Sequence, residues 1–313
     1  MTDPESWERK TLEKLAFSAL QEQRRARQWS IFFRVLTMAL LFILLFAIMG
    51  WFNKGEAPLS GKHTALVELR GVIAIGGDTH AERVISGLRD AFKDKGTQGV
   101  ILLINSPGGS PVQAGYINDE IRRLRAKYPK IPLYAVVEDI CASGGYYAAT
   151  AADKIFVDKA SIVGSIGVLM DGFGFTGTME KLGIERRLMT AGENKGFLDP
   201  FSPVNANQKE YAQKMLNEIH QQFITVVRQG RGKRLKETPD MFSGLFWSGE
   251  RSVQLGLADA LGSADYVARD IIKAEEIVDF TPQEGIAERF AKRFGAATAS
   301  AVNPLASSSM SLR

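Results

Sequence analysis

The chain has 313 residues, of which 45% are hydrophobic and 24% are charged, and its net charge is +4. This composition is that of an ordinary globular protein, with room for one large domain or two small ones. The basic residues form no long block, which argues against a nucleic-acid partner. The single cysteine excludes an internal disulfide, and the three histidines lack metal-ligand spacing, so we expect neither metal nor cofactor.

The N-terminal part predicts a membrane anchor preceded by a charged helix. Val35 to Phe52 is an uncharged run of 18 residues, extended by residues 31–33. At about 1.5 Å per residue it is about 27 Å long, close to the thickness of a hydrocarbon core. Its long leader and the lack of a small-residue cleavage site favour an uncleaved anchor over a signal peptide. Residues 5–28 predict an amphipathic helix that either binds a membrane or partner surface or is a solvated tail.

Basic residues on the two sides of the apolar run predict its orientation. Four arginines precede the run within about 15 residues, and two lysines follow it within the same distance. The excess on the N-terminal side places that end in the cytoplasm. The larger C-terminal part is therefore expected outside the cytoplasm.

Strand and helix patterns alternate from about residue 64 to residue 279, after a polar linker over 53–63. Strand patterns cover residues 65–75, 99–105, 132–139, 154–158 and 161–168. Helical patterns cover residues 80–94, 112–128, 144–152, 205–229 and 248–260. The apolar runs at 99–105 and 132–139 are typical of strands buried on both faces. This alternation predicts an α/β fold with a largely parallel sheet.

A serine, Ser143, follows the predicted strand 132–139 in the run Cys-Ala-Ser-Gly-Gly. Small neighbours let a substrate backbone approach, and a following helix points free N–H groups at the site. The N–H of Gly144 is thus a candidate oxyanion donor, and the Pro-Gly-Gly loop after strand 99–105 could add Gly108 or Gly109. From this motif alone, Ser143 could equally be a helix N-cap in a glycine turn.

No histidine stands out as a base for this serine. His63 lies in the linker, His80 in a polar loop and His220 in a helix of mixed character, so a surface or core role is favoured for all three. Cys141 has no histidine partner and is expected to be a buried thiol. A lysine whose pKa is lowered by desolvation could act instead, but composition does not identify which one.

Four segments in combination resemble the signal peptide peptidase A, or protease IV, family of serine peptidases. They are GVILLINSPGGS from residue 99, DICASGGYYAATAADKIFVDKASIVGSIGV from 139, TAGENKGFLDPFSP from 190 and WSGERSVQLGLADALGS from 247. The resemblance covers about residues 64–277 and looks like the short, single-domain bacterial form. It implies a fold like that of the Clp peptidase and the crotonases, with repeated ββα units around a twisted sheet, here preceded by one transmembrane helix.

The resemblance implies a Ser–Lys dyad. Ser143 would be the nucleophile, Lys195 the general base, and Ser165 a hydrogen-bond partner of Lys195. Gly108 or Gly109, together with Gly144, would form the oxyanion hole. Ser165 and Lys195 lie 22 and 52 residues after Ser143, which suits the family's order. The residues around Lys195 depart from the family pattern, since many relatives have an aromatic residue before the lysine, and this leaves fine specificity open.

The resemblance further implies an endopeptidase that cleaves hydrophobic peptides, such as remnant signal peptides, at a bacterial inner membrane. Relatives form ring or dome homo-oligomers, here expected between tetramer and octamer, and in some a neighbouring subunit contributes to one site. The expected organisation is a cytoplasmic tail over 1–30, an anchor over 31–52, a linker over 53–63, a peptidase domain over 64–280 and a partly disordered tail over 281–313. The alternatives are regulated cleavage of one membrane protein, a crotonase-like acyl-thioester enzyme, and a non-catalytic membrane scaffold.

Overall fold

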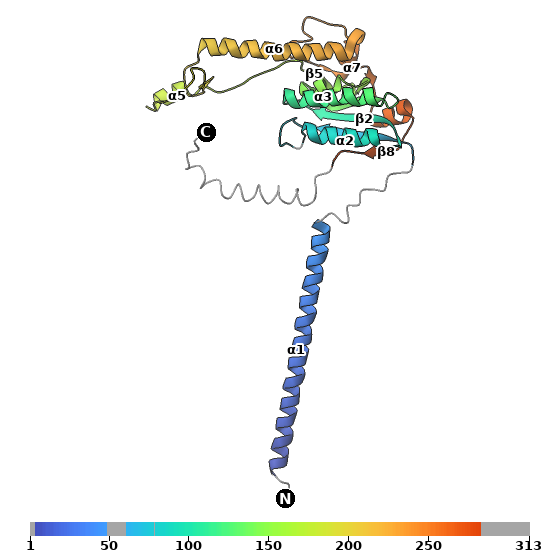
Figure 1. Ribbon diagram of the computed structural model, residues 1–313, viewed down its shortest axis with the longest axis vertical. Coiled ribbons are helices and arrows are strands. Elements are labelled where there is room, and N and C mark those ends of the chain that lie inside the picture. Colours follow the sequence, from blue (N-terminus) through green and yellow to red (C-terminus); the bar gives the residue numbers. More distant parts are fainter. Residues whose placement is uncertain (1–3, 49–60, 78, 283–313) are drawn as a thin grey trace. The chain divides into compact units, whose positions relative to one another are not determined.

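A computed structural model describes residues 4–48, 61–77 and 79–282 (Figure 1). The chain divides into two units, one with the N-terminal helix and one spanning Leu59–Pro282. The end of the predicted anchor, most of the linker over 53–63 and nearly all of the tail over 281–313 lie outside the described residues.

The N-terminal unit contains one long helix, α1, over Pro4–Ile48. Its stretch Thr11–Phe46 is long and apolar enough to cross a membrane, and it is the one such helix among the described residues. A signal sequence near an N-terminus meets the same criteria of length and apolarity. The charged stretch predicted over 5–28 continues into the apolar stretch without a break in the helix.

The second unit is built around an eight-stranded sheet in the order β6-β5-β3-β2-β1-β8, with β4 beside β3 and β7 beside β4. The strands are β1 His63–Arg70, β2 Thr97–Ser106, β3 Leu133–Ala142, β4 Lys154–Val157, β5 Ile162–Gly164, β6 Phe246–Ser248, β7 Ala260–Leu261 and β8 Ile277–Asp279. Neighbouring strands run parallel in every described pair except β5 with β6. The predicted α/β fold with a largely parallel sheet is confirmed.

Helices cover both faces of this sheet. They are α2 Ala81–Lys93, α3 Pro111–Lys127, α4 Gly144–Ala149, α5 Thr176–Lys181, α6 Ala206–Arg231, η1 Gly232–Arg234, α7 Gly249–Gln254, α8 Ala264–Tyr266 and η2 Val267–Ile272. The larger core cluster joins one face of the sheet to α2, α3, α4 and α6. The smaller cluster joins the other face to η2. Figure 1 shows α2 and α3 next to β2, with α6 beyond α3.

The core follows directly from the apolar patterns. Residues 100–104 of β2 are at most 8% exposed, because helices lie on both faces of that strand. On α2, Val84, Leu88 and Ala91 are buried at helical spacing. Burial of such a side chain contributes about 1.5–3 kcal/mol. At the start of α3 the Ser110 hydroxyl accepts a hydrogen bond from the N–H of Gln113, which ends the preceding loop as an N-cap.

Strand β3 pairs with two different strands along its length. Its first half, Tyr134–Val136, pairs with β4, and its last three residues, Ile140–Ala142, pair with β5. The register with β2 shifts between these halves. Strand β3 therefore extends beyond the predicted end at residue 139. Its last residue, Ala142, pairs with the last residue of β5, so Ser143 lies just beyond the end of both strands.

Two predicted strands are shorter than expected. The strand predicted over 65–75 ends at Arg70, because Gly71 turns the chain with φ of 76°. The strand predicted over 161–168 ends at Gly164, because Ser165 has φ of 51° and leaves the extended conformation. The short elements α5, β6 and β8 were not expected from the sequence pattern.

Residues 169–204, which we call the arm, leave the sheet after β5. Figure 1 shows its helix α5 beyond the N-terminal end of α6 and far from β5. The arm contacts α6 through the hydrogen bond from the N–H of Leu198 to Gln208 Oε1, 3.0 Å long, and through the ring contact of Phe197 with Tyr211. Several large apolar side chains of the arm are exposed, and Met189 reaches 94% exposure. A surface of this kind is typical of a protein interface.

A buried carboxylate joins α2 to α3 and makes stability depend on pH. Glu120, 8% exposed, receives hydrogen bonds from Arg123 and from Arg89. The hydrogen bonds from Arg123 lower the pKa of Glu120 from 4.5 to about 2, burial opposes this change, and the hydrogen bond and charge of Arg89 add to the lowering. Because the folded pKa lies below the unfolded one, the unfolded state binds the proton more readily, and stability is lost as the pH falls from about 4.5 toward 2.

We expect Glu120→Gln to lower stability at pH 7 and to have little effect near pH 2. The lowered pKa corresponds to at most about 3 kcal/mol, and the half-exposed arginines reduce this to about 1–2 kcal/mol. Urea unfolding of the detergent-solubilised full chain at pH 7 and near pH 2 measures the difference. Glu210→Gln is the matched control, since Glu210 pairs with Lys214 at an exposed site. An equal loss in both variants would contradict the assignment.

Candidate functional site

Ser143 occupies a strained turn between β3 and α4. Its φ of 50° and ψ of −120° are costly for a residue with a side chain, by about 1–3 kcal/mol. Its N–H donates to the Gly164 carbonyl over 2.9 Å, and its own carbonyl accepts from the N–H of Tyr147. Its side chain makes no capping hydrogen bond to α4. The simple N-cap interpretation of Ser143 therefore has no support, and the turn resembles the strained strand-to-helix turns that expose a nucleophilic hydroxyl.

Glycines from two loops meet at this serine. A Cβ added to Gly108 would lie 2.6 Å from the Gly144 nitrogen and 2.7 Å from the Ser143 Cβ. A Cβ added to Gly144 would lie 3.3 Å from the Gly109 nitrogen. The structure thus brings the Pro-Gly-Gly loop after β2 against the turn after β3, although 34 residues separate Gly109 from Ser143 in the chain.

The backbone N–H groups of this loop are not equivalent. The Gly108 N–H donates to Ser106 Oγ over 3.1 Å, and Ser106 Oγ donates to the Gly71 carbonyl over 2.6 Å. Ile73 holds the loop on the other side through two hydrogen bonds. Its N–H donates to the Gly108 carbonyl, and its carbonyl accepts from the Ser110 N–H. Within the described residues, the N–H groups of Gly109 and Gly144 have no such partner. These two N–H groups are therefore the available donors beside Ser143.

Two residues in this arrangement were missed from the sequence. Ser106 and Ile73 fix the glycine loop, yet Ile73 belongs to the strand pattern over 65–75 and Ser106 is only the first residue after the strand pattern over 99–105. The only available signal was the Ser-Pro that opens the loop, because a residue before proline is held in an extended conformation.

Ser165 lies beside Ser143 through the pairing of β5 with β3. The last residue pair in that ladder is Ala142 with Gly164, so Ser143 and Ser165 follow at the same end of adjacent parallel strands. Ser165 has φ of 51°, and its N–H donates to the Leu245 carbonyl over 2.8 Å. Ser143 and Ser165 thus both have a positive φ, and they follow adjacent strands at neighbouring positions.

Lys195 is not brought to Ser143 within one chain. It lies in the arm, in a turn that is closed by a hydrogen bond from its N–H to the Gly192 carbonyl. Lys195 is exposed. Among the described residues, the hydrogen bonds and ring contacts of the arm run within the arm or to α6. The physical reason is that the arm leaves the sheet before Lys195 and packs at the far end of α6.

The histidines and the cysteine have other environments. His63 is buried and stacks on Phe280, and His80 Nδ1 lies 3.0 Å from the Gly77 carbonyl. His220 Nε2 lies 3.1 Å from the Ile166 carbonyl, next to Ser165. Cys141 is fully buried, and burial raises the pKa of its thiol, so it is a core residue as predicted. Within the described part of the chain, no group of three or more His, Cys, Asp or Glu side chains could hold a metal ion.

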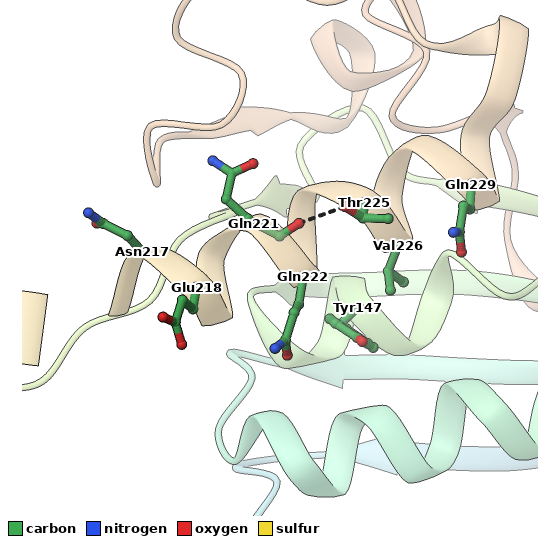
Figure 2. A pocket seen from close by; sticks show the side chains of 8 residues that line it. All are labelled: Tyr147, Asn217, Glu218, Gln221, Gln222, Thr225, Val226 and Gln229. Atoms are coloured by element: carbon green, nitrogen blue, oxygen red, sulfur yellow. Dashed lines mark hydrogen bonds between the residues drawn. The ribbon is translucent and has the colours of Figure 1, made fainter. Parts of the chain in front are cut away.

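An open groove of about 710 Å³ runs between α4 and α6. Figure 2 shows Tyr147 of α4 beside Gln222 and Val226 of α6. The other lining residues are Asn217, Glu218, Gln221, Thr225 and Gln229. The ring of Tyr147 also contacts that of Phe223, with ring centres 5.1 Å apart. Helix α6 thus packs directly against the helix that begins after Ser143.

The fold and this geometry are those of an α/β protein with a serine in a strained turn, beside two backbone N–H groups that have no hydrogen-bond partner among the described residues. Serine hydrolases use such an arrangement. Residues 125–277 match the family described as peptidase family S49. A protein named as a protease from Methanocaldococcus jannaschii is 35% identical over 209 residues, which cover 65% of this chain and 66% of the relative. "Protease 4" of Haemophilus influenzae is 31% identical over 204 residues, 65% of this chain and 32% of the relative.

A relative from Brucella melitensis has a different name, "Na(+)/H(+) antiporter NhaA". It is 46% identical over 202 residues, which are 63% of this chain but only 27% of the relative. The chain thus spans less than a third of that protein, and the name does not transfer. The family match and the protease relatives place the chain in the signal peptide peptidase A family of serine peptidases, as the sequence motifs predicted.

Proposed function

We propose that the protein is a membrane-anchored serine endopeptidase with Ser143 as nucleophile and Lys195 as general base. The observation that carries this proposal is the strained backbone of Ser143 beside the free N–H groups of Gly109 and Gly144. A protein gains nothing in stability from a serine at φ of 50°, so the turn is best explained by a chemical role of its hydroxyl.

The proposed reaction is acyl transfer. Neutral Lys195 takes the proton of the Ser143 hydroxyl, and the oxygen attacks the peptide carbonyl. The N–H groups of Gly109 and Gly144 bind the oxyanion, with Gly109 preferred to Gly108 because the Gly108 N–H is already bonded to Ser106. Lys195 then gives its proton to the leaving amine, and water hydrolyses the acyl-enzyme. Ser165 orients the Lys195 amine.

A neighbouring copy supplies Lys195 in this proposal. The exposed apolar side chains of the arm support it, since they would be covered by a second copy in a homo-oligomer. The contacts of the arm also support it, because among the described residues its hydrogen bonds and ring contacts run within the arm or to α6, and none joins Lys195 to its own Ser143. An interface that excludes water suits a lysine that acts as a general base.

The substrates we propose are hydrophobic peptides at the membrane, such as remnant signal peptides. The apolar helix α1 supports a site tethered to the bacterial inner membrane, and the basic residues before it support a cytoplasmic N-terminus. A peptidase held at the membrane surface meets the peptides that leave the membrane. Regulated cleavage of one membrane protein is the alternative, and in that case remnant signal peptides would not accumulate in cells that produce Ser143→Ala.

A fluorophosphonate probe tests the nucleophile. We expect the detergent-solubilised full chain to be labelled at one serine, and Ser143→Ala to abolish both labelling and peptide cleavage, because only an activated hydroxyl reacts. Ser161→Ala is a suitable control, since the Ser161 hydroxyl is buried and bonded to the Glu138 carbonyl. Labelling that survives Ser143→Ala would exclude this assignment. A crotonase-like enzyme or a non-catalytic scaffold would not be labelled at Ser143.

A further inference from the structure

Among the described residues, His220 makes the one side-chain hydrogen bond from α6 to the backbone that follows Ser165. Its Nε2 lies 3.1 Å from the carbonyl oxygen of Ile166, and Ile166 is fully buried. A carbonyl only accepts, so His220 Nε2 donates and carries a proton. This bond ends one residue away from the hydroxyl that is proposed to orient Lys195.

The backbone around Ser165 needs such a restraint. Ser165 has φ of 51°, a conformation that costs about 1–3 kcal/mol and persists only where neighbouring contacts impose it. On one side, the Leu245 carbonyl holds the Ser165 N–H. On the other side, the next residue is held by His220. Loss of either bond would let the segment relax toward an ordinary conformation and turn the Ser165 hydroxyl away.

Helix α6 is also fixed to the helix that follows Ser143. Its Phe223 contacts the ring of Tyr147, and the Tyr147 carbonyl in turn accepts a hydrogen bond from Asn118. Helix α6 therefore contacts both halves of the site, α4 through Phe223 and the segment after β5 through His220. A hydrogen bond from a helix that is already fixed restrains its acceptor more than one from a mobile side chain.

We infer that His220 is a positioning residue, which holds the Ser165 hydroxyl beside Ser143 through its hydrogen bond to the Ile166 carbonyl. This inference rests on the proposed function of Ser143 and Ser165. The donor N–H is the property that matters, and the charge or basicity of the imidazole is not required. A glutamine at position 220 can supply the same donor, whereas a methionine of similar length cannot.

The test compares His220→Gln with His220→Met in the detergent-solubilised full chain, with Gln221→Ala as the neighbouring control on α6. Both substitutions at 220 introduce good helix formers of similar size, so they differ mainly in the donor. We expect His220→Met to label with fluorophosphonate about tenfold more slowly and to lose kcat with little change in KM. His220→Gln should stay within about twofold of wild type, and Gln221→Ala should match wild type.

A double substitution shows whether His220 acts through Ser165. In the Ser165→Ala background, His220→Met should cause no further loss, because the group that it positions is gone. Equal rates for His220→Met and wild type, equal losses in His220→Gln and His220→Met, or full additivity with Ser165→Ala would each overturn the inference. So would a His220→Met protein that fails to fold while His220→Gln is normal, since the bond would then support the fold and not the site. Absence of labelling in the wild type would instead contradict the proposed function.

Discussion

Ser143→Ala and Lys195→Ala are each expected to abolish peptide cleavage, and co-assembly of the two inactive variants is expected to restore about a quarter of the wild-type activity. Each single loss should exceed about 10³-fold, because nucleophile and base act as one unit. Restoration follows if the Lys195 of one copy serves the Ser143 of the next. In an equal random mixture, half of the sites have an intact Ser143, and half of those face an intact Lys195.

The mixing experiment uses two differently tagged variants produced in one cell and purified through both tags, so that only mixed oligomers are assayed. A site completed within one chain would give no restoration, because every copy carries one defect. Co-production of Ser143→Ala with the double variant Ser143→Ala/Lys195→Ala is the control, and it should stay inactive. Failure of the two tags to copurify would contradict the proposed homo-oligomer itself.

The exposed arm gives this prediction its physical basis. Side chains such as Met189, Leu169 and Phe173 are 94%, 81% and 77% exposed in one chain. Large apolar side chains of this kind are normally covered by a partner. Lys195 belongs to the last part of the arm, so a second copy that covers the arm would also contact the segment that contains this lysine. In the proposed oligomer the interface would also exclude water from Lys195.

The elements of the sheet could be predicted because each buried run has its own local pattern. The apolar residues 100–104 and the helical spacing of Val84, Leu88 and Ala91 fix β2 and α2 without knowledge of their neighbours. The divided pairing of β3 could not be predicted, because it depends on β4 and β5 pairing with different parts of one strand. The arm has turns and short elements held by α6 alone, and no period in its sequence indicates them.

The residues of the proposed site were chosen from the sequence, whereas their geometry could not be. Small residues around Ser143 indicate a close approach of backbone, but the choice between Gly108 and Gly109 depends on Ser106, which takes up the Gly108 N–H. His220 gave no signal, since its partner is a carbonyl 54 positions away. A hydrogen bond to a backbone carbonyl leaves no mark in the sequence of the accepting residue.

Gly144→Ala is expected to lower kcat by about 10²-fold or more while the fold is kept. Gly144 is not among the residues with positive φ, so alanine is compatible with its backbone. Its new methyl group would lie 3.3 Å from the Gly109 nitrogen and 3.5 Å from the Gly108 Cα, on the side where the oxyanion is proposed to bind. Removing one oxyanion donor costs about 10²–10³-fold in other enzymes, and a methyl group that blocks access should act similarly.

The matched control for this substitution is Gly115→Ala in α3. A Cβ at Gly115 would meet nothing within 4 Å, and alanine in a helix is favoured over glycine by about 0.5–1 kcal/mol. We therefore expect wild-type kcat and equal or higher thermal stability for Gly115→Ala. For Gly144→Ala, thermal melting should change by a few degrees at most while kcat falls and KM stays close to wild type. A Gly144→Ala protein with normal kcat would show that the oxyanion binds elsewhere, because the methyl group would otherwise occupy part of its site.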